Sequence, residues 1–308
     1  MTESHQATWE QRPDTEEVLA LAAAAAEADG VEAVSEQSRL NLGSGRGRHL
    51  TVPARGEDPP GLLGYAQLWG DGAAELVVHP RARRRGVGSA LLAALREEQP
   101  DLRVWAHGRL PAATGLAEHA GLRAVRDLYR MSRPLTDDDA TDPALPEGFS
   151  VRSFETGRDE QTWLEVNALA FVQHPEQGRL RMPDLRERLK QPWFRAEDLL
   201  VLEEHGRGRP VMAGFHWTKL DPHTPSSVDP ARPAGEVYVL AVHPAYQGRG
   251  LAGPLTRLGL AHLARRGAPE VVLYVDGDND AARRTYAATG FTDASLDTVY
   301  ATDAAESD

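Results

Sequence analysis

The sequence contains no cysteine, which excludes disulfides, thiolate zinc sites and cysteine nucleophiles. Carboxylates, histidines, hydroxyls and backbone amides are left to do any chemistry. The sequence also lacks any apolar run near the roughly 20 residues that a membrane-spanning helix needs. Residues 1–10 contain no basic stretch followed by an apolar core, so neither a secretory nor a transit signal is visible. We therefore expect a soluble, cytoplasmic protein that has no membrane partner and no metal.

Positive charge is scarce as well, because 34 Lys and Arg face 46 Asp and Glu and the net charge is −12. Affinity for duplexes depends on clustered Lys and Arg that neutralise phosphates, so we expect no nucleic-acid partner. One basic run stands out against this background and consists of Arg81, Arg83, Arg84 and Arg85. It indicates either a local anionic partner or a solvated face.

An internal repeat divides the chain. Its 308 residues exceed the usual size of one core, which favours two domains of roughly 150 residues each. In each half an apolar run leads through His-Pro and a glycine-rich turn into an amphipathic helix, beginning at Glu75 and at Tyr238. Three pairs of residues share an offset of 164 positions, namely His79 and His243, Gly86 and Gly250, and Gly88 and Ala252. Gly121 and Gly290 are 169 positions apart, so the second copy is five residues longer at that point.

The segment between the copies predicts the domain boundaries. Residues 135–148 are rich in Asp, Pro and small residues, which cannot bury an apolar face and are typical of a linker. We therefore predict an N-terminal domain at 1–134, a linker at 135–148 and a C-terminal domain at 149–308. Helical patterns alternate with β-branched strands in both halves, which predicts an α/β fold. The clearest elements are a helix over 15–28 capped by Asp14, strands over 75–78, 199–203, 211–220, 236–242 and 271–276, and a disordered acidic tail over 301–308.

The loop between strand and helix carries the chemistry. Both halves contain the pattern Gln/Arg-x-x-Gly-x-Gly/Ala, beginning at Arg83 and at Gln247. Glycines let the backbone approach a ligand closely, successive N–H groups point into one concavity, and the helix N-terminus adds positive partial charge. Such a loop suits a pyrophosphate, and Arg84, Arg85 and Arg249 are available as further phosphate partners. We expect the two His-Pro histidines to shape the turn before the loop.

On these motifs the sequence resembles the GCN5-related N-acetyltransferase superfamily, whose hallmark is this strand, loop and helix that hold the CoA pyrophosphate. The resemblance covers both halves and implies two tandem domains, each a mixed, splayed central sheet flanked by helices. It implies acetyl-CoA as the cosubstrate, with its pantetheine beside the fourth strand. The implied coenzyme residues of the second half are Leu240, Ala241, Val242, Gln247, Gly248, Arg249, Gly250, Leu251, Ala252, Gly253, Asn279, Asp280, Ala281, Ala282, Arg283 and Arg284. Those of the first half are Leu76, Val77, Val78, Arg84, Arg85, Gly86, Val87, Gly88 and Ser89.

Acetyl transfer to an amine needs a base, a group that stabilises the oxyanion, and an acid for the departing thiolate. Glu236, at the start of the fourth strand of the second half, is the candidate base, and Tyr286 resembles the family's general acid. A backbone N–H within 240–242 is placed, in this family, to polarise the thioester carbonyl. The alternatives are that Tyr286 is a packed aromatic and Glu236 a charge at a strand edge.

The same positions in the first half indicate that it is not catalytic. Glu236 falls on Gly72 and Tyr286 on Ala117 when the offsets of the repeat are applied, and Asn279 falls on Leu110. The phosphate loop is nevertheless retained. Two interpretations stay open: the first domain binds CoA without turning it over, or it is a purely structural copy.

More specifically, the whole chain resembles the mycothiol synthase family, which acetylates the cysteinyl amine of a cysteine-glucosamine-inositol conjugate. This resemblance rests on "SEQSRL", "AFVQHPEQG", "GFHWTK", "GEVYVLAV" and "LYVDGDN". It implies that Glu36, Glu176, Lys219, Glu236 and Tyr274 hold the acceptor. Gly277 and the acids around it depart from the family pattern beside the expected path of the coenzyme.

Two alternatives to this function remain at the level of sequence. Another amine, such as an aminoglycoside, a polyamine or a protein N-terminus, would also be chemically suitable. A CoA-sensing module without turnover is the other alternative, although Glu236 and Tyr286 in one copy speak against it. We expect a monomer that binds acetyl-CoA and a small amine.

Overall fold

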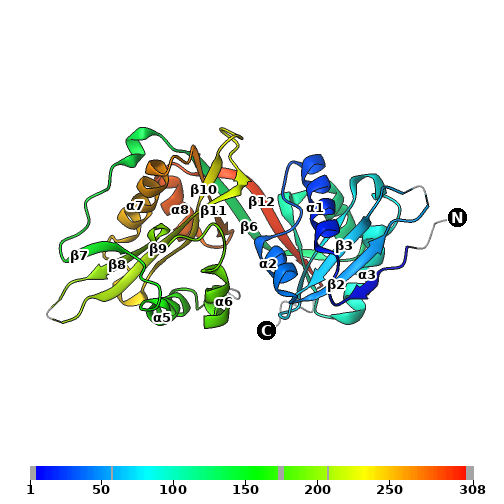
Figure 1. Ribbon diagram of the computed structural model, residues 1–308, viewed down its shortest axis with the longest axis horizontal. Coiled ribbons are helices and arrows are strands. Elements are labelled where there is room, and N and C mark those ends of the chain that lie inside the picture. The colour runs from blue at the N-terminus through cyan, green and yellow to red at the C-terminus, as the bar shows by residue number, and fades with distance from the viewer. Residues whose placement is uncertain (1–4, 57, 173–176, 207, 303–308) are drawn as a thin grey trace. The chain divides into compact units, whose positions relative to one another are not determined.

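The computed structural model describes residues 5–56, 58–172, 177–206 and 208–302. These residues form two compact units (Figure 1). Unit 1 contains the described residues up to Tyr129, Asp276–Asp278, and those from Ser295 on. Unit 2 contains Arg130–Val275 and Asn279–Ala294, again as far as they are described. Two strands, β6 (Arg123–Pro134) and β12 (Thr292–Ala301), have residues in both units.

Unit 1 has a sheet in the strand order β1-β2-β3-β4-β5, in which β4 and β5 are parallel and the other neighbours antiparallel. The last strand of the chain, β12, pairs with the other edge of β5 over residues 298–301. Its strands are β1 (Thr8–Glu10), β2 (Arg48–Pro53), β3 (Leu62–Leu68), β4 (Ala73–Val78) and β5 (Arg103–Ala106). Its helices are α1 (Thr15–Asp29), α2 (Glu36–Ser44), α3 (Val87–Glu98) and α4 (Pro111–His119).

Unit 2 repeats this pattern with the order β7-β8-β9-β10-β11, in which only β10 and β11 are parallel among the described pairs. Its strands are β7 (Phe149–Ser153), β8 (Leu199–Glu204), β9 (Val211–Pro225), β10 (Pro233–Val242) and β11 (Glu270–Asp276). Its helices are α5 (Glu160–Ala170), α6 (Met182–Arg188), α7 (Ala252–Arg265) and α8 (Asp280–Ala288). The repeat seen in the sequence is therefore a repeat of the fold, and the prediction of two mixed sheets flanked by helices is confirmed.

Alternation along the strands buries side chains on both faces of each sheet, where helices cover them. In unit 1, Tyr65 and Val77 contribute to the core beneath α1, whereas Ala66 lies in the core with α3. In unit 2, the ring of Trp163 on α5 packs 4.9 Å from Phe215. The next residue, His216, points to the opposite face and bonds the carbonyl of Leu255 on α7. This alternation is the two-residue period of a strand that is buried on both faces.

Local signals explain where the predicted elements begin and end. Asp14 accepts the N–H groups of Glu16 and Glu17 and so starts α1, which ends at Gly30 in the left-handed region, φ 72°. The predicted helix is confirmed and runs one residue further than predicted. Each predicted strand is present and several are longer, because tertiary pairing extends them beyond their β-branched cores.

The C-terminal end differs from the prediction. Ala301, which was assigned to a disordered tail, is fully buried and is the last residue of β12, where it pairs with Arg103. Residues 303–308 lie outside the described part of the chain. The described residues from Ser295 on group with unit 1, whereas the predicted C-terminal domain ran over 149–308. The reason is that β12 completes the far edge of β5, a pairing that no local pattern encodes.

Candidate functional site

The two phosphate loops have the same backbone conformation. Gly248 and Gly250 adopt φ of 77° and 74°, and their counterparts Arg84 and Gly86 adopt 62° and 90°. Positive φ at alternate residues turns successive N–H groups toward one side and forms an anion-binding concavity. Arg84 adopts this conformation without the freedom of glycine, which costs of order 1–2 kcal/mol. The loop of unit 1 therefore keeps the shape of a phosphate cradle despite its different sequence.

The same hydrogen bonds hold both loops. His243 Nδ1 accepts the N–H of Ala245 at 3.1 Å, and His79 Nδ1 accepts that of Arg81 at 3.2 Å. These bonds cap the short 3₁₀ turns Pro244–Tyr246 and Pro80–Ala82. The prediction that the His-Pro histidines shape the turn is confirmed.

The first residue of each loop ties it back to the preceding strand. Gln247 donates to the carbonyl of Val242 at 3.2 Å, and Arg83 donates to that of Val78 at 3.3 Å. Arg83 also forms a bidentate pair with Asp29. Its guanidinium is thus used within the fold, and the pKa of Arg83 is raised by this pairing.

The central strands of each unit separate next to these loops. In unit 2, the paired residues of β10 and β11, two strands described in full, run from Gly235 with Val271 to Val237 with Leu273. β10 then continues to Val242. In unit 1, β4 and β5 pair from Ala73 to Glu75, and β4 continues to Val78. Main-chain groups at the end of the fourth strand are therefore left without a neighbouring strand on that edge, where an extended ligand can bond them.

A β-bulge distinguishes the fourth strand of unit 2 from that of unit 1. Val237 lies opposite Thr218 and Val239 opposite Trp217, so Tyr238 is an extra residue in β10. The pairing of β4 with β3 continues without such a shift from Gly64 to Leu68. Bulges leave backbone groups unpaired and are frequent beside active sites.

The bulge also corrects the position predicted for the counterpart of Glu236. Glu236 pairs with Val272 on β11, and Ala73 pairs with Arg103 on β5. Arg103 and Val272 are equivalent by the 169-residue offset of the later repeat. The counterpart is therefore Ala73, not Gly72, because the extra residue of the bulge shifts the count by one. Unit 1 still has no carboxylate at this position.

Glu236 lies in a charged cluster on the face of the sheet that α5 covers. It is opposite Lys219 in the register of β10 and β9, and the Lys219 Nζ lies 3.7 Å from its Oε2. The same Nζ lies 3.7 Å from Asp221 Oδ2, 4.8 Å from the ring centre of Trp193 and 5.3 Å from that of Tyr238. The side chain of Lys219 is 6% exposed, and those of Glu236 and Asp221 are 15% and 18% exposed. The structure thus brings two predicted residues, Glu236 and Lys219, together.

Tyr286 lies on α8, half-buried, with its ring 5.8 Å from that of Phe291. Burial raises the pKa of Tyr286 to about 12, so its phenol keeps its proton at neutral pH. Asn279 begins the helix, where its Oδ1 accepts the N–H of Ala282 at 3.1 Å. The helix that carries Tyr286 thus starts at a predicted coenzyme residue.

The remaining predicted acceptor residues have different positions. Tyr274 lies on β11 and its side chain is 48% exposed, two residues after Val272, the neighbour of Glu236. Glu36 is the first residue of α2 in unit 1. Glu176 lies outside the described residues.

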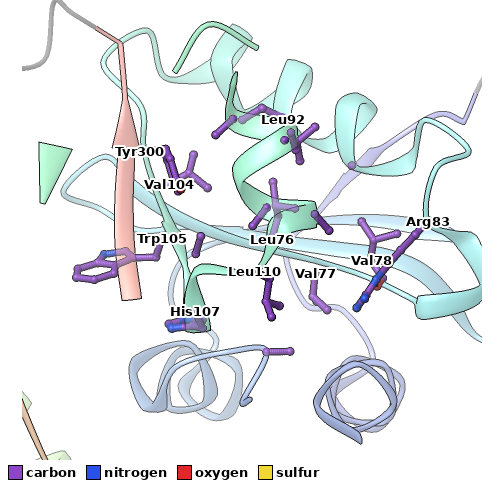
Figure 2. A pocket seen from close by; sticks show the side chains of 18 of the residues that line it. Leu76, Val77, Val78, Arg83, Leu92, Val104, Trp105, His107, Leu110 and Tyr300 are labelled. Carbon is purple, nitrogen blue, oxygen red and sulfur yellow. The ribbon is translucent and has the colours of Figure 1, made fainter. Parts of the chain in front are cut away.

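Unit 1 contains a pocket of about 550 Å³ beside its phosphate loop (Figure 2). Leu76 and Val78 from β4, Leu92 from α3 and Tyr300 from β12 give it largely apolar walls. The lining includes nearly all of the coenzyme residues predicted for this half, in particular Leu76, Val77, Val78, Arg84, Gly86, Gly88 and Ser89. A cavity of this size and lining can hold an extended, largely apolar chain whose phosphates lie at the loop.

His107, which also lines this pocket, belongs to a buried ionic cluster that sequence reasoning missed. Its Nδ1 lies 2.9 Å from Asp297 Oδ2, and its Nε2 lies 3.7 Å from Glu75 Oε1. Burial lowers the pKa of His107, but its interactions with Asp297 and Glu75 outweigh burial and raise the pKa to about 10. Glu75 also accepts the N–H of Ser35 at 2.9 Å. Glu75 is therefore held by fixed partners, and no local sequence signal links these residues, which come from separate strands and loops.

Two family models match the chain, one in each half. The acetyltransferase (GNAT) family matches residues 163–291, and an acetyltransferase (GNAT) domain matches residues 48–130. Each match includes a glycine loop and the three strands before it, β8 to β10 in one match and β2 to β4 in the other. No helix among the described residues is long and apolar enough to cross a membrane.

Curated relatives and solved structures agree with these matches. A mycothiol acetyltransferase of Thermomonospora curvata is 47% identical over 294 residues, which cover 94% of this chain and 93% of that protein. A mycothiol acetyltransferase of Streptomyces coelicolor is 46% identical, with 94% and 92% covered. A GCN5-related N-acetyltransferase from Sphaerobacter thermophilus has a TM-score of 0.68 at 23% identity, covering 96% of this chain and 94% of its own. A tandem GNAT protein from the clavulanic acid pathway has a TM-score of 0.69 at 18% identity, covering 99% and 100%.

Proposed function

The chain belongs to the acetyltransferase (GNAT) family and, within it, to the mycothiol acetyltransferases, and from this premise we propose that unit 2 acetylates the cysteinyl amine of a cysteine-glucosamine-inositol conjugate, with acetyl-CoA as donor. The observation that carries the proposal is the position of Glu236. Its carboxylate lies on β10 just before the bulge at Tyr238 and just before β10 separates from β11. An amine beside it would meet the end of a coenzyme that lies along the separated strand.

We assign the coenzyme to three segments of unit 2 whose backbone and side-chain groups fit the parts of an acyl-CoA. The loop from Gln247 to Gly253 offers N–H groups to the diphosphate, and residues 240–242 offer main-chain groups to the pantetheine amides. Residues from Asn279 to Arg284 at the start of α8 complete the proposed site. Acetyl-CoA supplies the acetyl group as a thioester.

Two side chains and one backbone group share the catalytic roles in the proposed reaction. Glu236 accepts a proton from the acceptor ammonium, directly or through a water, and the freed amine nitrogen attacks the thioester carbon. A backbone N–H within residues 240–242 stabilises the negative charge that develops on the carbonyl oxygen. As the carbon–sulfur bond breaks, Tyr286, whose pKa of about 12 keeps it protonated until then, donates its proton to the departing sulfur. The nitrogen of the new amide then loses its surplus proton, which reprotonates Tyr286 directly or through water.

Unit 1 is proposed to bind the coenzyme without turning it over. It has a phosphate cradle and an adjacent pocket, but Ala73 and Ala117 occupy the positions of Glu236 and Tyr286, and β4 has no bulge. Glu75, the carboxylate next to this region, is already held by His107 and Ser35. The side chains of the proposed base and acid are therefore both missing from the corresponding positions of unit 1.

The acceptor is assigned to Lys219, Glu236 and Tyr274 of unit 2, together with Glu36 and Glu176 by family resemblance. A polyhydroxylated ligand that carries an ammonium needs carboxylate acceptors and few apolar walls. The cluster of Glu236, Asp221 and Lys219 carries a net charge of about −1 when all three are ionised. Such a cluster attracts one ammonium.

A thiol-release assay tests the function. Purified protein, acetyl-CoA and the cysteinyl glucosamine-inositol conjugate are compared with the same mixture containing a polyamine or an aminoglycoside. We expect the highest kcat/KM with the conjugate. A higher value with either of the other amines would show that the acceptor is wrongly assigned, and no release with any amine would favour a CoA-sensing module.

A further inference from the structure

The ammonium of Lys219 occupies an enclosure that would suit a cationic ligand. Two aromatic rings, those of Trp193 and Tyr238, lie 4.8 and 5.3 Å from its Nζ, and two carboxylates lie 3.7 Å from it. Aromatic faces and carboxylates are the groups with which proteins bind ammonium ions. In this protein the cation in the enclosure is a side chain of the chain itself.

The fold fixes this cation in place. Lys219 is directly opposite Glu236 across two antiparallel strands, and Asp221 follows it on the same face of β9. The aromatic rings are fixed in turn, because Trp193 and Tyr238 contact each other at 5.2 Å and Arg188 donates to the Tyr238 hydroxyl at 3.1 Å. Since the Lys219 side chain is almost fully buried, its charge is weakly screened and stays within a few ångströms of the proposed base.

We propose that Lys219 is a specificity determinant that rejects acceptors carrying a second positive charge near the reacting amine. The inference rests on the proposed function, because it places the acceptor amine at Glu236. One acceptor ammonium at Glu236 brings the summed charge of Glu236, Asp221 and Lys219 to about zero, whereas a second ammonium close to the first would meet the fixed ammonium of Lys219. Like charges that face each other in this way discriminate strongly between partners. A cysteinyl amine on a neutral sugar carries no second positive charge and is accepted, whereas a polyamine carries one and is repelled.

The first test compares acceptors in charge-removing variants. We expect Lys219→Met to raise the ratio of kcat/KM for spermidine to kcat/KM for the conjugate by roughly tenfold or more, since Met keeps the length of the side chain without its charge. The ratio cancels any loss of rate that both acceptors share through Glu236. Lys219→Arg keeps the charge and is expected to leave the ratio near that of the unmodified protein. Lys190→Met, which removes an exposed lysine outside the cluster, is the matched control.

A second test uses the unmodified protein, so that it decides the matter even if Lys219→Met does not fold. Butylamine and 1,4-diaminobutane are compared at neutral pH as inhibitors competing with the conjugate. We expect the monoamine to inhibit at lower concentration than the diamine. Stronger inhibition by the diamine, or an acceptor ratio in folded Lys219→Met equal to that of Lys190→Met, would overturn the inference. Failure of the proposed function is a separate result, seen as no turnover of the conjugate by the unmodified protein.

Discussion

At the scale of single residues, Glu236 and Tyr286 are distinguished by what surrounds them. The carboxylate of Glu236 has the fixed ammonium of Lys219 3.7 Å away. Tyr286 is half-buried, and this partial burial raises its pKa to about 12, which favours the protonated form that an acid needs. The proposed base and the proposed acid thus lie in different environments, and acid–base catalysis uses such differences to give two groups different roles.

Removal of either group should slow turnover without removing the coenzyme site. Glu236→Gln and Tyr286→Phe are each expected to lower kcat by roughly 10- to 10,000-fold, the usual range for general acid–base groups. Steady-state assays measure kcat, and calorimetry with CoA measures the affinity. Ala117→Ser in unit 1 is the control and should leave kcat within about twofold, since that residue is outside the proposed chemistry. Unchanged kcat in Glu236→Gln would remove Glu236 from the mechanism.

His216 makes the stability of the protein depend on pH. It is fully buried, its Nδ1 donates to the Leu255 carbonyl, and burial lowers its pKa to about 4. The unfolded chain binds this proton below about pH 6.5, and the folded chain does so only near pH 4, so stability is present above pH 6.5 and is lost as pH falls toward 4. The loss is about 3 kcal/mol. Urea unfolding between pH 7.5 and 4.5 should show this slope, and a non-titrating His216→Gln should show a smaller one.

At the scale of elements, α7 depends on a glycine that helix propensity alone would disfavour. A Cβ at Gly259 would lie 2.0 Å from the His216 ring, so Gly259→Ala should destabilise by about 1–3 kcal/mol. Gly43 in α2 has no atom within 4 Å of such a Cβ, so Gly43→Ala should instead stabilise by up to about 1 kcal/mol. Thermal unfolding measures both. Stabilisation by Gly259→Ala would contradict the packing described for His216.

Elements were predictable from the sequence where their cause is local. The His-Pro turn, the glycine loop and the helix after it follow one another along the chain, and the cap at Asp14 lies within three residues of its partners. The register of β10 was not predictable, because the bulge at Tyr238 is defined only by the opposing strand. That is why the counterpart of Glu236 was placed at Gly72 instead of Ala73.

The candidate site, too, was predictable only where the signal is local in the sequence. The residue types of Glu236, Lys219 and Tyr286 were found from motifs and family resemblance. Their electrostatic setting was not, because the rings around Lys219 come from other segments of unit 2. The ionic cluster at His107 was missed for the same reason, since its partners Glu75 and Asp297 lie 32 and 190 residues away in the sequence.

At the scale of the whole molecule, the two units have similar folds, and the tasks proposed for them differ. The positive φ values of Gly248 and Gly250 are repeated by Arg84 and Gly86, so both units keep the backbone geometry that we propose binds phosphate. Only unit 2 keeps the carboxylate, the phenol and the bulge. The proposal therefore predicts that coenzyme binding by unit 1 and turnover by unit 2 can be measured separately.

Calorimetric titration with CoA should give two binding sites per chain, and matched glycine variants should remove them one at a time. Gly250 and Gly86 adopt φ of 74° and 90°, with no atom within 4 Å of an added Cβ, so alanine there strains the loop without a clash. That strain is about 1–2 kcal/mol, which corresponds to about 5- to 30-fold in affinity. Gly250→Ala should raise the KM for acetyl-CoA by this factor, whereas Gly86→Ala should weaken one calorimetric site and leave the kinetics unchanged. A single site in the unmodified protein would show that unit 1 is a purely structural copy, and kinetics altered by Gly86→Ala as much as by Gly250→Ala would show that turnover depends on both cradles.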